Sequence, residues 1–359
     1  MAEHFYRLQS RRLPIWSSFI KRERCSMSKV FLIGGPGNIS RGTIDYLLER
    51  NSDIAVFTRN TAEKHVRQPN IHYYEGSRND ADSLGRALRD FGAQLVIDTI
   101  CFTLREAEQL YEITRGRIAH LLFISTVDIY GYPLSRLPYR ESDDRRPPHG
   151  EYANNKWQVE QFYMDKYTTE VFPVTIGRPS LSIGPHFCPM LFRDWGKFAV
   201  PRMKANRPIL VPGDGNGLMH VGWGYDVGRM AGRIIGDRAA IGKDYTLSTP
   251  QCIARDDYIS LFTRELKVDP ERVYIPSHYI ETFAGVNALS PIPHLYRHHM
   301  AFSLDKFKHD FPDYEWLPLL HGVKEFIVEN EARSAFPDLQ IEIIEDRIIA
   351  EWKKRLAGW

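Results

Sequence analysis

Cysteine is scarce in this chain, and the spacing of the few cysteines excludes two kinds of site. The sequence has 359 residues and four cysteines, and it contains no C-x-x-C motif. Thiols this far apart predict neither a metal cluster nor a disulfide framework, and they are typical of a reducing compartment. We therefore expect free thiols, no metal site and a cytoplasmic protein. The cysteines are Cys25, Cys101, Cys188 and Cys252.

An excess of charge of one sign and long apolar runs are also missing. The formal net charge is only +2, which gives no general electrostatic reason to expect a nucleic acid or an anionic membrane as partner. No apolar run approaches the length of a membrane-spanning helix. The composition, 43% hydrophobic and 26% charged, is that of a soluble globular protein. The expected partner is a small molecule.

The N-terminal segment lacks the apolar stretch of a secretory signal, although it is rich in Lys and Arg. We interpret 1–27 as a flexible basic extension, since the first strand pattern follows directly after Met27-Ser28-Lys29. An upstream start codon and an organelle transit peptide are the alternatives.

A glycine-rich turn comes next. Val30–Ile33 is a short apolar run of the kind found in buried parallel strands, and 40–50 has apolar residues at helical spacing. Strand, turn and helix place backbone N–H groups at a helix N-terminus, where a pyrophosphate binds well. Ser40 stands where the third glycine of G-x-G-x-x-G is expected. The turn residues predicted to bind the cofactor are Gly34, Gly37, Asn38 and Ile39.

Strand-like and helix-like segments alternate through the first half of the chain. This alternation predicts an α/β fold, with a Rossmann-type doubly wound parallel sheet covered by helices on both faces. We expect an NAD(P)-binding domain over 28–179. Residues 180–359 would form a smaller, mainly substrate-binding region with C-terminal helices, part of which rejoins the sheet. Further strands are predicted at 54–57, 71–74, 95–98, 121–124 and 174–176, and helices at 80–91, 104–114, 226–235, 256–266 and 341–356.

Tyr152 and Lys156 are four residues apart, so on a helix both side chains lie on one face. A free tyrosine has a pKa of about 10 and is a poor base at neutral pH. A nearby cation favours the phenolate and lowers that pKa. The pair can therefore move a proton on or off a hydroxyl while another group takes the hydride.

With its motifs in this order, the chain resembles the extended short-chain dehydrogenase/reductase family, the group of nucleotide-sugar epimerases and dehydratases. The glycine turn resembles T-G-x-x-G-x-x-G, Ser125–Gly131 resembles S-[ST]-x-x-V-Y-G, and Tyr152–Lys156 matches Y-x-x-x-K. Farther on, 178–185 resembles R-P-x-x-x-Y-G-P, and 220–227 resembles an H-V-x-D-V box with two additional residues. The resemblance covers about 28–260.

The resemblance implies roles for these residues. Tyr152 would be the catalytic acid/base, Lys156 would bind the nicotinamide ribose and lower the tyrosine pKa, and Thr126 would hydrogen-bond the reacting oxygen. Nicotinamide would supply hydride chemistry that no side chain can perform. The remaining residues assigned in this way are Asp98 and Arg178, which would bind the cofactor, and Ser125, Asp128 and His220, which would bind the substrate.

No carboxylate ends the second predicted strand. NAD-binding folds usually place Asp or Glu there to hold the ribose hydroxyls, but this chain has Thr58-Arg59-Asn60. The planar fork of Arg59 can pair with a 2′-phosphate, so we predict an NAD(P) cofactor and favour NADP. The Gly-Asp usual in the family after the third strand is replaced by Gly76-Ser77, which puts the usual adenine contact in doubt. Cys101-Phe102 follows the fourth strand, where the cofactor channel should pass, although simple packing explains the pair equally well.

Within the family, we favour an epimerase of a sugar or nucleotide-sugar. A 4,6-dehydratase has an Asp-Glu pair after the threonine, and here those positions are Val127 and Asp128, which weakens that alternative. A one-way NADP-dependent reductase or dehydrogenase uses the same residues and stays open. A non-catalytic RNA-binding or redox-sensing protein is a third alternative, against which Tyr152 and Lys156 argue. Homodimers are common in the family, so a homodimer is also an open expectation.

Overall fold

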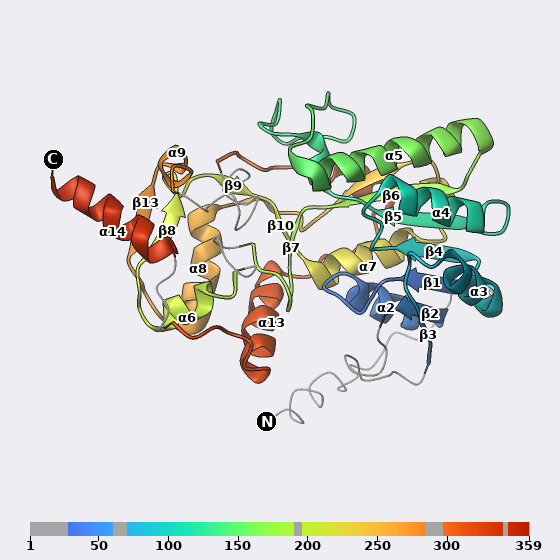
Figure 1. The fold of residues 1–359 in the computed structure, drawn as a ribbon, viewed down its shortest axis with the longest axis horizontal. Coiled ribbons are helices and arrows are strands. Elements are labelled where there is room, and N and C mark those ends of the chain that lie inside the picture. The colour runs from blue at the N-terminus through green and yellow to red at the C-terminus, as the bar shows by residue number, and fades with distance from the viewer. Residues whose placement is uncertain (1–27, 60–69, 190–195, 284–296, 340–343, 359) are drawn as a thin grey trace.

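The central element of the computed structural model is a seven-stranded parallel sheet (Figure 1). The structure describes residues 28–59, 70–189, 196–283, 297–339 and 344–358. Strand order is β11-β6-β5-β4-β1-β2-β3, the doubly wound arrangement predicted from the alternating pattern. The strands are β1 (Lys29–Ile33), β2 (Asp53–Thr58), β3 (Ile71–Glu75), β4 (Leu95–Asp98), β5 (His120–Ile124), β6 (Val174–Pro179) and β11 (Asp244–Leu247).

Helices cover both faces of this sheet, which is why its inner strands β1, β4 and β5 are buried along almost their whole length. Successive side chains of a strand point to opposite faces. Phe31 and Ile33 of β1 therefore pack with α3, α4 and α5, whereas Val30 and Leu32 pack with α2, α7 and α12. The helices are α2 (Ser40–Leu48), α3 (Ala81–Phe91), α4 (Leu104–Thr114), α5 (Gly150–Glu170), α7 (Gly224–Ile234) and α12 (Asp305–Asp310).

Two glycines let α2 and α7 approach closely. A Cβ atom on Gly42 would lie 1.7 Å from the Tyr225 carbonyl oxygen, and one on Gly228 would lie 1.9 Å from the Ile39 carbonyl oxygen. The Thr43 hydroxyl also donates to the Gly228 carbonyl (2.9 Å). Since α2 follows the glycine-rich turn, this contact fixes the turn against the second half of the chain.

The second half builds its own core beside the carboxyl end of the sheet, drawn on the left of Figure 1. Its strands form three pairs, β7 (Leu181–Ile183) with β10 (Val221–Trp223), β8 (Ile209–Pro212) with β13 (Arg272–Ile275), and β9 (Leu218–Met219) with β12 (Ile253–Ala254). Its helices are α6 (Ala199–Lys204), α8 (Arg255–Leu266), α9 (Ser277–Ile280), α13 (Leu319–Ala332) and α14 (Ile344–Ala357). Two short 3-10 helices lie elsewhere in the chain, η1 (Val127–Tyr130) after β5 and η3 (Arg238–Ala240) before β11.

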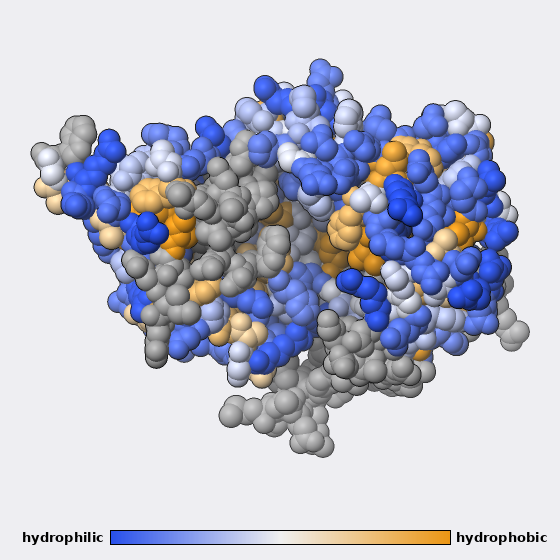
Figure 2. All heavy atoms as spheres, viewed as in Figure 1, coloured by the Kyte–Doolittle hydropathy of each residue, from blue (hydrophilic) through white to orange (hydrophobic). Residues whose placement is uncertain are grey.

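The strands and helices predicted in the first half are confirmed, with limits that differ by at most three residues, at the end of β6, and β4 and α4 have the predicted limits. The part of the second half that returns to the main sheet is β11. The predicted extension 1–27 lies outside the described residues. The face of the molecule seen in Figure 2 is mostly hydrophilic, with apolar residues in separate patches. Within the described ranges, no helix is long and apolar enough to cross a membrane.

Candidate functional site

The glycine-rich turn joins β1 to α2 at the carboxyl end of the sheet. Gly34 and Gly35 have φ angles of +92° and +137°, a region that favours glycine because it has no Cβ. A Cβ on Gly34 would also lie 2.6 Å from the Thr99 hydroxyl oxygen. The helix starts at Ser40, so the amides of Asn38 and Ile39 lie at its N-terminus, where anions bind. The turn therefore fits a dinucleotide pyrophosphate.

Ser40 explains how the turn forms without its third glycine. The Gly37 amide donates to the Ser40 hydroxyl oxygen (2.7 Å), so the serine closes the turn from inside. The Asn38 side chain accepts a hydrogen bond from the His186 amide (3.1 Å). It also fills the space beside Gly184, where a Cβ would lie 2.6 Å from Asn38 Cγ. Asn38 thus uses its side chain to bind the second half of the chain.

Ser125 and Thr126 follow β5 and begin η1. The Thr126 hydroxyl oxygen accepts a hydrogen bond from the Asp128 amide (3.2 Å) and so caps this short helix. The Ser125 hydroxyl is buried and has no hydrogen-bond partner in the described part of the chain. A buried hydroxyl without a partner is costly, which makes Ser125 a suitable donor for a bound substrate.

Tyr152 and Lys156 lie on the first turns of α5, as their spacing predicted. The Lys156 ammonium donates to the carbonyl of Ile124, the last residue of β5 (2.8 Å). Lys156 is 2% exposed and Tyr152 is 49% exposed. The ammonium lies 6.0 Å from the centre of the Tyr152 ring. The helix therefore brings a buried cation and an accessible phenol to the carboxyl end of the sheet.

Burial shifts the pKa of each titratable group of this site in the direction that favours its neutral form. Burial raises the pKa of the Tyr152 phenol, the Asp128 carboxylate raises it further, and a hydrogen bond with Thr126 lowers it. Burial lowers the pKa of Lys156 to about 8. Burial also raises the pKa of Asp128 to about 6, against the hydroxyls of Thr126 and Tyr132, which lower it. Opposed shifts of this kind are typical of proton-transfer sites.

Tyr132 was missed at the level of the sequence. Its hydroxyl is buried beside the Asp128 carboxylate, and a hydrogen bond between the two lowers the pKa of Asp128 and contributes to raising the pKa of Tyr132, which burial raises most. The signal was its position immediately after Gly131, which ends the Ser125–Gly131 motif.

Asp98 lies at the end of β4 as predicted, but it is fully buried. One carboxylate oxygen accepts from the Ile100 amide (3.1 Å), and the other is paired with Arg78. Arg78 comes from the segment between β3 and α3, close to the Gly76-Ser77 departure noted above. The segment that lacks the family's usual aspartate, Gly76-Ser77, is thus followed by an arginine that forms a buried ion pair, and no motif predicted this pair. Arg59 is exposed and follows directly after β2.

Two predicted residues are held in buried networks instead. The Arg178 guanidinium donates to both carboxylate oxygens of Glu160 (3.0 and 2.8 Å) and to the Tyr130 hydroxyl (3.0 Å), and it pairs with Asp244 (2.6 Å). The His220 ring accepts from the Phe302 amide (3.1 Å), so its other nitrogen donates to the Thr249 carbonyl (2.7 Å). Both side chains are therefore almost fully buried and engaged in contacts with other parts of the protein.

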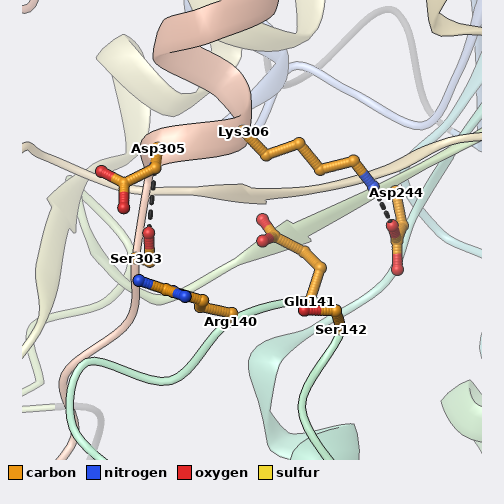
Figure 3. A pocket seen from close by; sticks show the side chains of 7 residues that line it. All are labelled: Arg140, Glu141, Ser142, Asp244, Ser303, Asp305 and Lys306. Carbon is orange, nitrogen blue, oxygen red and sulfur yellow. Dashed lines mark hydrogen bonds and ion pairs between the residues drawn. The ribbon is translucent and has the colours of Figure 1, made fainter.

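A separate cavity of about 330 Å³ lies beside β11, the edge strand of the main sheet (Figure 3). The Lys306 ammonium meets the Asp244 carboxylate there (2.5 Å). None of the predicted site residues lines this cavity, although Asp244 joins it to the Arg178 network. The lining residues are Arg140, Glu141, Ser142, Asp244, Ser303, Asp305 and Lys306.

The structure therefore brings Ser125, Thr126, Asp128, Tyr152 and Lys156 together beside a glycine-rich turn of dinucleotide-binding form. Together these features define a Rossmann-type protein with a candidate proton-transfer site. A family model described as the NAD dependent epimerase/dehydratase family matches residues 30–247. The chain belongs to this family, whose members are enzymes, and the predicted extended short-chain dehydrogenase/reductase resemblance is confirmed.

Solved structures with the same fold include several enzymes of this kind. An epimerase from Methanothermobacter thermautotrophicus is 16% identical, with a TM-score of 0.69 over 86% of this chain and 94% of that chain. A dTDP-glucose 4,6-dehydratase from Bacillus anthracis, in complex with NAD, is 17% identical, with a TM-score of 0.67 over 86% and 98%. A UDP-glucose 4-epimerase from Thermus thermophilus, also with NAD, is 16% identical, with a TM-score of 0.66 over 84% and 99%. At these identities the likeness shows the fold alone. A search of curated protein sequences gives no significant match.

Proposed function

We propose that this protein is an NAD(P)-dependent epimerase of a sugar or nucleotide-sugar. The observation that carries the proposal is the placement of Thr126, Tyr152 and Lys156 at the carboxyl end of β5, beside the turn between β1 and α2. Ligands of doubly wound folds bind at this edge of the sheet. The epimerase and dehydratase structures with the same fold support the choice of reaction and of a nucleotide-sugar as the substrate class.

In this proposal, Tyr152 exchanges a proton with the reacting hydroxyl of the substrate. The Tyr152 residue is half-exposed, so a substrate can contact its side chain, although the atoms around the phenol still bury it enough to raise its pKa. Ser125 and Thr126 hold the same oxygen by hydrogen bonds and fix the distance over which the proton moves. The positive charge of Lys156 favours the phenolate as the proton leaves. A bound dinucleotide would supply the hydride acceptor through its nicotinamide ring. The amides of Asn38 and Ile39 would hold the pyrophosphate of that cofactor.

Asp128 and Val127 favour the epimerase over the 4,6-dehydratase. Elimination of water needs an acid and a base in addition to the tyrosine. Of the two positions after Thr126, only Asp128 carries a carboxylate, and Val127 is buried and apolar. Epimerisation needs only that the hydride leaves and returns, so a single acid/base residue is sufficient.

Arg59 supports NADP as the preferred form of the cofactor. Its side chain is exposed at the end of β2, where NAD-specific folds carry a carboxylate that would repel a 2′-phosphate. The guanidinium can form two parallel hydrogen bonds to such a phosphate. We propose that the protein binds NADP(H) more tightly than NAD(H).

The test is to identify the nicotinamide that the purified protein carries. Native mass spectrometry measures the mass of the bound cofactor, and absorbance after denaturation measures its amount and redox state. An epimerase returns its hydride in every turnover, so retained cofactor is expected. Protein that is purified empty but binds NADPH reversibly would favour a one-way reductase. Absence of affinity for either cofactor would refute the enzymatic proposal.

A further inference from the structure

Phe102 lies beside the proton-transfer site, in the turn between β4 and α4. Its amide donates to a carboxylate oxygen of Glu106 (2.6 Å), which also accepts from the Thr103 amide (2.9 Å). The Glu106 amide donates back to the Thr103 hydroxyl oxygen (3.4 Å), which completes a capping box at the start of α4. The backbone from which the Phe102 ring extends is therefore firmly held.

The Phe102 ring contacts the buried Lys156 ammonium and is itself partly exposed to solvent. Three aromatic rings surround the Lys156 ammonium, with ring centres at 4.8 Å for Phe102, 5.0 Å for Phe123 and 6.0 Å for Tyr152. Phe123 is fully buried, whereas Phe102 is 45% exposed and Lys156 only 2% exposed. The Phe102 ring thus has one side toward the ammonium and another side toward water.

A buried ammonium needs compensation, and here it receives little from carboxylates. Within the described residues, Lys156 has no carboxylate oxygen within 4.0 Å, and its hydrogen bond goes to the Ile124 carbonyl (2.8 Å). Removing a cation from water is costly. The negative faces of aromatic rings attract a cation and recover part of that cost.

We infer that Phe102 is a positioning residue of the proton-transfer site, whose ring shields Lys156 from solvent and holds its ammonium at the end of β5 beside Tyr152. The purpose of this arrangement rests on the proposed function, since a dehydrated and fixed cation acts more strongly on a neighbouring phenol. The arrangement itself does not depend on which cofactor or substrate is bound.

The charged and titratable groups around Lys156 set the direction of the expected effect. Burial is the main reason why the pKa of Lys156 falls to about 8. Removing the ring takes away its attraction for the cation, which lowers the pKa of Lys156, and admits water, which raises it. Because burial is the largest cause of the shift, the second effect should prevail and the pKa of Lys156 should rise toward its ordinary value. The other groups that act on it are Cys101, Asp98 and Glu106, which raise its pKa, and Arg78, which lowers it.

The test measures the titration of Lys156 directly, in full-length protein labelled with ¹³C-lysine. The ¹³Cε resonance of Lys156 is assigned by its loss in Lys156→Arg and followed by NMR as the pH is raised. Phe102→Leu should move the midpoint upward by about half a pH unit or more. Phe102→Tyr keeps the aromatic face and should titrate as the wild type does. Trp157→Leu removes an exposed ring of α5, the helix that carries Lys156. This ring is not among the three around the ammonium, so the midpoint should stay unchanged.

An unchanged or lowered midpoint in Phe102→Leu would overturn the inference, and so would a Phe102→Tyr variant that behaves like Phe102→Leu. Phe102→Met replaces the leucine variant if thermal unfolding shows the latter to be unstable. The titration needs neither cofactor nor substrate. A protein that binds no nicotinamide would therefore refute the proposed function and leave the result on Phe102 standing.

Discussion

Replacing Glu160 by Gln removes the charge that Arg178 meets in the core. Both side chains are 1% exposed, and two hydrogen bonds of 3.0 and 2.8 Å join them. Removing one partner of such a buried pair typically costs about 3–5 kcal/mol, because the other charge remains buried without compensation. Asp244 stays 2.6 Å from the same guanidinium and offsets part of that loss. We therefore expect Glu160→Gln to lower the free energy of unfolding by about 3 kcal/mol.

The assay is urea unfolding followed by tryptophan fluorescence, with two further variants. Glu112→Gln breaks the exposed pair of Glu112 with Arg115 and should change stability little, because surface ion pairs contribute little. The double variant Glu160→Leu/Arg178→Met removes both charges and should be more stable than Glu160→Gln. The same double variant should bind NADPH within about twofold of the wild type, a change of only a few tenths of a kcal/mol, because the Arg178 side chain is buried and paired with other residues of the protein. Normal stability in Glu160→Gln, or loss of cofactor binding by a stably folded double variant, would refute the structural role of Arg178.

Three further predictions test the site and the fold. Tyr152→Phe removes only the phenol hydroxyl, so turnover should fall by about 10²–10⁴-fold while the Kd for NADPH, measured by its fluorescence, is unchanged; wild-type turnover would end the assignment. Arg59→Ala should weaken NADP(H) at least about tenfold more than NAD(H) in calorimetry, because only the 2′-phosphate differs; equal weakening would show that Arg59 is not the selector. Burial lowers the pKa of His120 from 6.5 to about 4, and its Nδ1 accepts from the Gly236 amide (3.0 Å), so the folded protein resists protonation there. Because the unfolded chain takes up that proton first, His120 should make the protein about 2 kcal/mol less stable at pH 5 than at pH 7.5, a loss that should be absent from His120→Gln in urea unfolding at the two pH values.

The parts of the structure that the sequence predicted are those set by short segments. A buried parallel strand is a run of apolar residues, and the helices between such strands carry an apolar stripe, so both patterns are visible locally. The turn at Gly34 and the i, i+4 spacing of Tyr152 and Lys156 are also local. Their common location follows from topology, since the carboxyl ends of parallel strands lie at one edge of a sheet.

What the sequence did not reveal depends on contacts between distant segments. Arg178 lies in a matching motif, but its guanidinium is paired with Glu160 of α5 and Asp244 of β11, and the approach of α5 and β11 is a tertiary event. Arg78 finds Asp98 across the sheet in the same way. A single sequence shows a charged residue without its partner, so a buried ion pair looks the same as a ligand-binding arginine.

Tertiary burial also explains why the phenolate form of Tyr152 is disfavoured when no substrate or cofactor is bound. Burial and the negative charge of Asp128 raise the pKa of the Tyr152 phenol and keep it neutral. Burial also lowers the pKa of Lys156 and so disfavours its charged form. Both shifts oppose the phenolate–ammonium pair that proton transfer needs. Positive charge brought to the exposed side of Tyr152, or a substrate oxygen hydrogen-bonded by Ser125 and Thr126, shifts the balance toward phenolate. In the proposed mechanism, proton transfer at Tyr152 is therefore coupled to occupation of the site.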